Sequence, residues 1–125
     1  MIVGIGVDVV DLARFERALD RTPSLRARLF ADEELVSGER VLSLRSLAGR
    51  FAAKEALIKA FGESTGIRWH DMRVVADEHG NPSLHISGPA QAVADRHGVS
   101  RLHLSMSHDA GVAIAYVVAE SGAPS

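Results

Sequence analysis

The feature that most constrains the fold of this chain is a helical segment that is apolar on nearly every side. The segment begins at about Ser43, runs to Phe61 and stops at Gly62, the residue type most common just after a helix end. From residue 50 to residue 60 only four charged side chains interrupt it, and a helix with so little polar surface is expected to be buried. The sequence therefore predicts one long central helix.

Residues 2–10 alternate in the way expected of a β-strand. One face carries four branched apolar residues, which are Val3, Ile5, Val7 and Val9. The opposite face includes Gly4, Gly6 and Asp8. Glycine inside a strand usually marks a close approach by another backbone or by a ligand. Asp8 comes directly after two such positions on the same face of the strand.

The rest of the chain has the pattern of short helices followed mostly by strands. Asp11 is suited to cap a helix that Thr22 and Pro23 end. Further segments are helical turns at 24–30 and 32–36, strands at 72–77 and 83–87, a helix at 89–97 closed by Gly98, and strands at 101–107 and 112–119 around a turn at 109–111. This order predicts an α+β fold with a largely antiparallel sheet, in a single small domain over residues 1–120 with a flexible tail over 121–125.

The composition excludes several classes of protein. Fourteen Lys and Arg residues against 16 Asp and Glu give a formal charge of −2, without the strong basic field that general nucleic-acid binding requires. The absence of cysteine excludes disulfide scaffolds, thiolate metal sites and cysteine nucleophiles. The apolar run Met1–Val7 is too short to span a membrane and has no basic segment before it, so we expect a cytoplasmic protein with no membrane partner.

The arginines are unevenly distributed along the chain, since eight of the twelve lie in its first half. Between residues 14 and 28 only Glu16 and Asp20 oppose five of them, which are Arg14, Arg17, Arg21, Arg26 and Arg28. One interpretation is a solvated helical face, and the other is a docking surface for an acidic partner.

Glu55 is the first candidate for chemistry. It lies about 40° around the helix from Phe51, on a stripe of large apolar side chains. Lys59 follows one turn later, so an ordinary i,i+4 ion pair is one interpretation. The other interpretation pairs Glu55 with Asp8, because two partly buried carboxylates, with water and phosphate oxygens, commonly hold Mg²⁺ in proteins. Lys59 would then face the phosphate as a point charge.

The segment Ser105–Asp109 is a further candidate, with two hydroxyls and an imidazole at a predicted strand end. His108 in this segment could donate to a phosphate, act as a base or satisfy a turn. A Ser/His/Asp hydrolase is disfavoured, because triad members that are neighbours in sequence rarely have the required geometry. The other histidines lack the spacing of a zinc site, and the chain contains neither G-x-G-x-x-G nor a Walker loop.

Three blocks of sequence occur together in one order. They are Gly4-Ile5-Gly6-Val7-Asp8, then Arg50-Phe51-Ala52-Ala53-Lys54-Glu55-Ala56 with Lys59-Ala60, and finally Ser105-Met106-Ser107-His108-Asp109. Together they resemble the short, bacterial-type 4′-phosphopantetheinyl transferases, the holo-acyl-carrier-protein synthase family. The likeness covers Val3–Ala119, and the central block is the most specific of the three.

The resemblance implies a reaction, a cofactor and partners. Family members transfer the phosphopantetheine arm of coenzyme A to a serine of apo acyl carrier protein, with Mg²⁺, and release adenosine 3′,5′-bisphosphate. By this resemblance Asp8 and Glu55 would be the Mg²⁺ ligands, and Lys59 would contact phosphate. Coenzyme A would also be held by Arg50, Ser107, His108 and, in the adenine pocket, Pro82. The five arginines of residues 14–28 would meet the acidic carrier protein.

The resemblance also implies a homotrimer with its sites between subunits. It leaves the proton acceptor open between Glu55 through a metal-bound water, His108 and Asp109, in that order. Phe30-Ala31-Asp32-Glu33-Glu34 resembles the family's Phe-Thr-x-x-Glu segment with alanine in place of threonine, so Asp32 is expected to serve as the helix cap.

Two rival functions use the same residues. A Mg²⁺-dependent phosphodiesterase would need the carboxylates but has no use for an arginine surface. A module that binds coenzyme A or a carrier protein without catalysis would need the binding residues alone.

Overall fold

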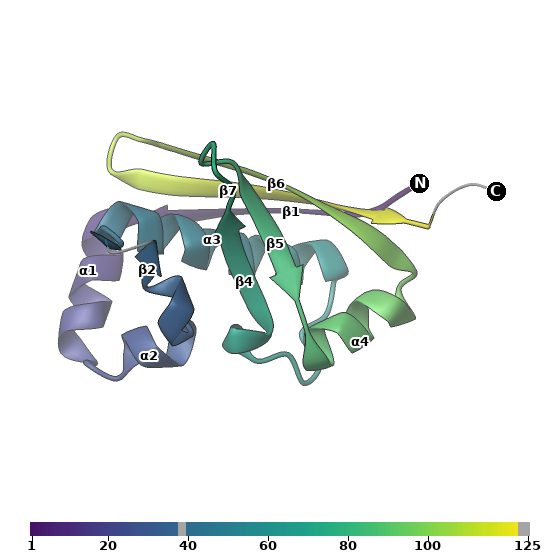
Figure 1. Ribbon diagram of the computed structural model, residues 1–125, viewed down its shortest axis with the longest axis horizontal. Coiled ribbons are helices and arrows are strands. Elements are labelled where there is room, and N and C mark those ends of the chain that lie inside the picture. Colours follow the sequence, from purple (N-terminus) through teal and green to yellow (C-terminus); the bar gives the residue numbers. More distant parts are fainter. Residues whose placement is uncertain (38–39, 123–125) are drawn as a thin grey trace.

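Helix α3 (Leu44–Phe61) lies along one face of a three-stranded antiparallel sheet (Figure 1). The computed structural model describes residues 1–37 and 40–122 of the chain. The strands of this sheet lie in the order β1 (Ile2–Asp11), β7 (Val112–Ser121) and β6 (Val99–Asp109). The predicted α+β fold, with a largely antiparallel sheet and one long central helix, is confirmed.

The remaining elements cover the helix on the side away from the sheet. They are α1 (Leu12–Arg21), α2 (Leu25–Leu29), the 3-10 turns η1 (Asp32–Glu34) and η2 (Trp69–Asp71), the pair β2 (Val36–Ser37) and β3 (Arg40–Val41), the hairpin β4 (Met72–Ala76) and β5 (Pro82–Ile86), and α4 (Gly88–Arg96). In Figure 1 the β4–β5 hairpin crosses in front of α3. The core therefore forms around α3.

The ends of the helices follow the capping residues in the sequence. The Asp11 carboxylate accepts the Arg14 N–H at 2.9 Å at the start of α1. Ser43 caps α3 by accepting the Ser46 N–H at 3.2 Å, and Gly62 ends that helix at a φ of 77°. These predicted boundaries are confirmed, because each depends on a local hydrogen bond or on glycine's freedom to adopt positive φ.

Gly4 and Gly6 let the backbone of α3 approach β1 directly. A Cβ atom on Gly4 would overlap the carbonyl oxygen of Ala60 and lie 2.9 Å from its carbon. A Cβ atom on Gly6 would overlap the carbonyl oxygen of Ala56 and lie 2.8 Å from its carbon. The predicted close approach at these two positions is confirmed, and the partner is a helix backbone.

This approach exposes the other face of the sheet. Val3, Ile5, Val7 and Val9 of β1 are 42%, 57%, 39% and 57% exposed, and Tyr116 of β7 is 50% exposed. The inner face is lined mainly by small residues of β7, which are Ala113, Ala115 and Ala119. The branched apolar side chains of β1 therefore form an uncovered surface, which we call the outer sheet face and define by these five exposed residues.

Three sequence expectations differ from the structure. The pair β2–β3 was not predicted, and β6 extends two residues beyond the expected strand at each end, because β7 pairs with it from Val99 to Asp109. The expectation that Asp32 caps the turn η1 is wrong. Ala31 occupies that position, and its N–H donates instead to the Glu34 carboxylate at 3.1 Å.

The structure describes only the first part of the tail predicted at 121–125. Ser121 is the last residue of β7, and its N–H donates to the Met1 carbonyl at 2.7 Å. Residues 123–125 lie outside the described residues. Within the described ranges, no helix is both long enough and apolar enough to cross a membrane.

Replacing Gly6 by alanine should destabilise the protein by about 3 kcal/mol, because the new methyl group would force α3 away from β1. The free energy of unfolding, measured by urea denaturation, checks this. Gly122→Ala is the matched control, since a Cβ atom there meets nothing within 4 Å. Equal stabilities of the two variants would contradict the close approach.

Candidate functional site

Asp8, Glu55 and Lys59 come together where the C-terminal half of α3 crosses β1. The Lys59 Nζ donates to Asp8 Oδ1 at 2.9 Å and to the Val7 carbonyl at 3.1 Å. The Asp8 side chain is 17% exposed and that of Lys59 is 53% exposed. The ammonium group therefore bonds to the carboxylate of the strand. The predicted meeting of Asp8 and Glu55 is supported because the Asp8 carboxylate is near enough to raise the pKa of Glu55.

The environment of Glu55 disfavours its charged form. Partial burial raises the pKa of the Glu55 carboxyl, the nearby Asp8 carboxylate raises it further, and the Lys59 ammonium opposes both effects. Two carboxylates at a partly buried position repel each other. A cation placed between them would relieve that repulsion.

The donor set fits a magnesium ion that is shared with a ligand. Among residues 1–37 and 40–122, no three Asp, Glu or His side chains lie close enough to form a metal site made by protein groups alone. Mg²⁺ is commonly held by one or two carboxylates, with water and substrate phosphates completing its shell. Asp8 and Glu55 supply two hard oxygen donors, and Lys59 adds a positive charge beside them.

Arg50 and Pro82 lie in a second location, on the other flank of α3. They line a cleft of about 230 Å³ together with Ser46, Gly80 and Met106. Arg50 donates to the Val74 carbonyl, which holds the guanidinium against β4. Burial lowers the pKa of Arg50 from its usual range. The Arg50 guanidinium gives this cleft a positive charge that suits part of an anionic ligand.

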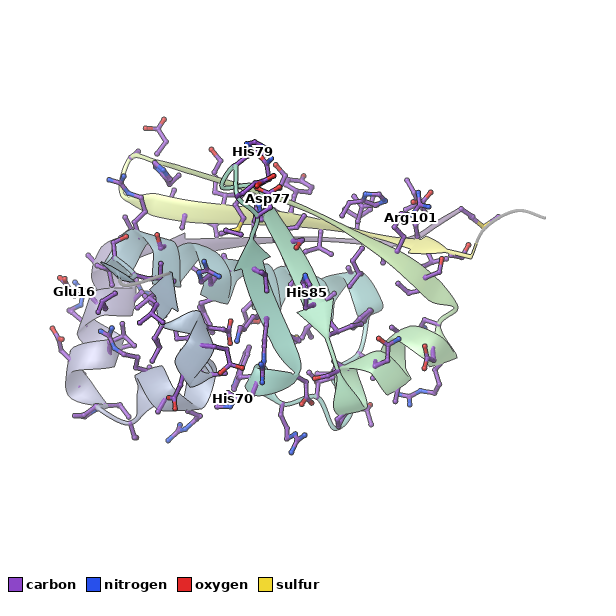
Figure 2. All side chains as sticks on the ribbon, in the orientation of Figure 1. Glu16, His70, Asp77, His79, His85 and Arg101 are labelled. Carbon is purple, nitrogen blue, oxygen red and sulfur yellow. The ribbon has the colours of Figure 1, made fainter. Side chains whose placement is uncertain are left out.

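The hairpin that carries Pro82 has a well-braced tip, where Figure 2 shows Asp77 and His79. The Asp77 carboxylate accepts the backbone N–H groups of Asn81 and His79, each at 2.8 Å. The bond from Asn81 is the main cause of the lowered pKa of Asp77. The wall of the Arg50 cleft is therefore a preorganised turn.

Ser107, His108 and Asp109 lie at the end of β6 and are exposed. Ser107 is in register with Ile114 and His108 with Ala113, so their side chains point to opposite faces of the sheet. Asp109 Oδ1 accepts the Ala110 N–H at 2.9 Å within the turn. Within one chain the structure does not bring these three residues to Glu55.

The five arginines of residues 14–28 are all exposed on α1 and α2. We call this set, which is Arg14, Arg17, Arg21, Arg26 and Arg28, the arginine surface. On α1 the apolar residues Phe15 and Leu19 are buried, which leaves the arginines in water.

The predicted site residues thus form two groups on opposite flanks of α3. Arg50 and Glu55 are about 140° apart around the helix. Ala56 and Ala60 touch β1, whereas a Cβ atom on Gly49 would lie 2.7 Å from the Met106 side chain of β6. Because β1 and β6 are the two outer strands of the sheet, the Glu55 group and the Arg50 group face different edges of the molecule.

Sequence reasoning missed a buried ion pair behind the site. Lys54 is 0% exposed, and its Nζ donates to Glu34 Oε1 at 2.8 Å, to the Leu29 carbonyl at 2.7 Å and to the Trp69 carbonyl at 3.0 Å. Burial lowers the pKa of Lys54, and the bond to Glu34 opposes this shift. The sequence did carry a signal for this pair, because a lysine inside an apolar helix is buried and a buried ammonium group requires an acceptor.

Sequence reasoning also missed that Gly62–Gly66 reads G-x-S-x-G. A nucleophile elbow of that pattern joins a strand to a helix. Here the segment follows the C-terminus of α3 and precedes the turn η2, so its setting differs from that of an elbow.

Comparisons with known proteins agree with the motifs. Residues 4–117 match the sequence family described as the 4′-phosphopantetheinyl transferase superfamily. The holo-[acyl-carrier-protein] synthase of Clavibacter michiganensis is 61% identical over 99% of this chain and 100% of its own. The crystal structure of the Neisseria meningitidis holo-[acyl-carrier-protein] synthase has a TM-score of 0.81 at 37% identity, covering 97% of this chain and 100% of its own.

A second similar structure contains a ligand. It is the Bacillus anthracis holo-(acyl-carrier-protein) synthase in complex with CoA (3′,5′-ADP), with a TM-score of 0.76 at 36% identity. The match covers 98% of this chain and 99% of that one.

Replacing Glu55 by glutamine should raise the melting temperature at pH 7 without divalent cations. Because the folded-state pKa of Glu55 is raised, the folded state binds more protons than the unfolded state between the two pKa values. The wild type therefore gains stability as the pH falls through this window, and the advantage of Glu55→Gln should shrink toward about pH 4.

Calorimetry across this pH range measures the difference between the two proteins. Glu16→Gln, at an exposed position of α1 labelled in Figure 2, is the matched control. A Glu55→Gln variant less stable than the wild type at pH 7 would contradict the electrostatic conflict between Glu55 and Asp8.

Proposed function

Because this chain belongs to the 4′-phosphopantetheinyl transferase superfamily, we propose that it transfers the phosphopantetheine arm of coenzyme A to a serine of an apo acyl carrier protein. The serine oxygen forms a bond to the phosphorus that carries the pantetheine arm, and the diphosphate bridge breaks. Adenosine 3′,5′-bisphosphate leaves, and the serine proton goes to a base. The observation that carries this proposal is the meeting of Asp8, Glu55 and Lys59 at the crossing of α3 and β1.

Asp8 and Glu55 would hold Mg²⁺ at this crossing. The ion would neutralise charge on the diphosphate and on the leaving group. Lys59 would contribute a further positive charge at the same place, because its ammonium is more than half exposed and lies beside Asp8. Transfer of this type depends mainly on positioning and on neutralising charge, and these three side chains can do both.

Glu55 is our first choice of proton acceptor for the carrier serine. Its carboxylate lies beside Asp8 and Lys59, where the reacting diphosphate would be held. His108 and Asp109 follow in that order. Asp109 ranks last because its carboxylate already accepts a hydrogen bond from the backbone of the turn.

Coenzyme A would be bound by both groups of site residues. Arg50 and Pro82, in the cleft on the β6 side of α3, would hold the nucleotide end, with Ser107 and His108 nearby on β6. The diphosphate would lie at Asp8 and Glu55. Since the two groups are on opposite flanks of α3, we propose that each site is completed by a second copy of the chain, in a homotrimer that buries the outer sheet face.

The arginine surface would bind the carrier protein. Its five exposed guanidinium groups suit an acidic partner, and charge complementarity of this kind speeds association and selects the partner. The cytoplasmic location stays a prediction.

Intact mass spectrometry tests the proposed reaction. We expect an apo acyl carrier protein, incubated with this chain, coenzyme A and Mg²⁺, to gain one phosphopantetheinyl group, and to gain nothing in EDTA. Binding of coenzyme A without any gain would favour a binding module. Release of adenosine 3′,5′-bisphosphate without modification would favour a phosphodiesterase.

Asp8→Asn and Glu55→Gln should each reduce the transfer rate at least about 100-fold, because each removes one proposed Mg²⁺ ligand and its charge. Both variants should keep the wild-type circular dichroism spectrum. Asp95→Asn, at an exposed position of α4, is the control that should transfer at the wild-type rate. Full activity of either ligand variant at limiting Mg²⁺ would overturn the metal assignment.

Tyr116→Glu should convert the wild-type trimer into monomers and abolish transfer, because it introduces a charge into the apolar outer sheet face. Light scattering after size-exclusion chromatography measures the mass. The matched control is Val75→Glu on β4, since Val75 is 43% exposed and lies outside that face. A wild-type chain that is monomeric and fully active would contradict the proposed assembly.

A further inference from the structure

A cleft of about 560 Å³ separates α2 from η2, on a part of the surface that neither group of site residues reaches. In Figure 2 His70 lies at this place, below β4 and beside α2. We call it the α2–η2 cleft. The residues that matter for the argument are Ala27, Arg28, Arg68, Trp69, His70 and Arg73.

The rim of the cleft carries excess positive charge. Arg68 pairs with the buried Asp71 at 3.1 Å, but its side chain is 74% exposed. Arg73 pairs with Glu33 of η1. Arg28 is exposed on the opposite wall. Three guanidinium groups against two carboxylates leave the cleft suited to a ligand that brings further negative charge.

The walls of the cleft are held in place. The Nε2 group of His70 donates to the Ala27 carbonyl at 2.7 Å, which joins η2 to α2. The Trp69 ring packs against Phe51 with 5.5 Å between the ring centroids, and the Trp69 carbonyl accepts the buried Lys54 ammonium. Trp69 is partly exposed and lines the cleft, so an apolar floor lies beneath a basic rim.

We propose that the α2–η2 cleft is a second contact region for the acidic carrier protein, which inserts an apolar side chain flanked by carboxylates. Arg28 belongs to the arginine surface and also lines the cleft, so one basic strip continues from α1 through α2 to Arg68, which precedes η2. The apolar side chain would lie on Trp69, and the carboxylates would reach Arg28 and Arg68. This inference rests on the proposed function.

Trp69 gives a direct test, because it is the only tryptophan among the 125 residues. A tryptophan-free, acidic apo acyl carrier protein is titrated into this chain, and the emission of Trp69 is recorded. We expect a saturable change in intensity or wavelength whose midpoint falls at the KM of the carrier protein. A wild type that transfers phosphopantetheine with no change in Trp69 emission would overturn the cleft as a contact region.

Three arginine-to-glutamine variants complete the experiment. Arg28→Gln and Arg68→Gln should each raise the KM for the carrier protein about threefold to tenfold and leave the KM for coenzyme A unchanged. Arg96→Gln is the matched control for Arg68→Gln, because Arg96 also pairs with a carboxylate, Glu63, at 3.0 Å but lies on α4. Glutamine at position 68 can still donate a hydrogen bond to Asp71, and melting curves report whether each variant folds.

The experiment distinguishes failure of the cleft proposal from failure of the proposed transferase function. Loss of the cleft alone would appear as an active wild type in which Arg68→Gln has the same KM for the carrier protein as Arg96→Gln. Loss of the proposed function would appear as no transfer by the wild type to any carrier protein, and it would remove the basis of the cleft proposal as well.

Discussion

The contact between the backbones of α3 and β1 is the interaction on which the rest of the structure depends. Gly4 and Gly6 remove the side chains that would separate the strand from the helix, so Ala56 and Ala60 lie directly on β1. This contact brings Asp8 beside Lys59 and within electrostatic reach of Glu55. It also turns the branched side chains of β1 outward. One packing constraint therefore creates both the candidate site and the outer sheet face.

The buried Lys54–Glu34 pair holds the other side of α3. The Lys54 ammonium bonds to the end of α2, to η1 and to η2. One side chain therefore ties three segments to α3, at the position next to Glu55. Removing two charges from water is expensive, and Glu34 Oε2 is buried with no hydrogen-bond partner in the described part of the chain. We interpret the pair as a device that fixes the arrangement of these segments more than as a source of net stability.

Prediction from the sequence succeeded where the cause was local or periodic. The limits of α3 follow from Ser43 and Gly62, and the close approach at β1 follows from two glycines in one strand. It failed where the cause was a distant contact. The turn η2, the partner of Lys54 and the α2–η2 cleft all depend on segments far apart in the sequence, which no local pattern relates. The residues of the candidate site were predictable by resemblance, which also implied sites between subunits, but the membership of the two groups was not predictable.

That separation has a consequence for how such a chain would work. Glu55 faces the β1 edge of the sheet, whereas Arg50 lines a cleft at the β6 side, with α3 between them. A ligand whose nucleotide end binds at Arg50 and whose diphosphate binds at Glu55 cannot use both groups of one chain without passing around a buried helix. In the assembly proposed above, a second copy of the chain supplies the group that the first cannot reach, and the contact between copies covers the apolar sheet faces. The exposed valines of β1 and the divided site would then have one explanation, which is contact between copies of the chain.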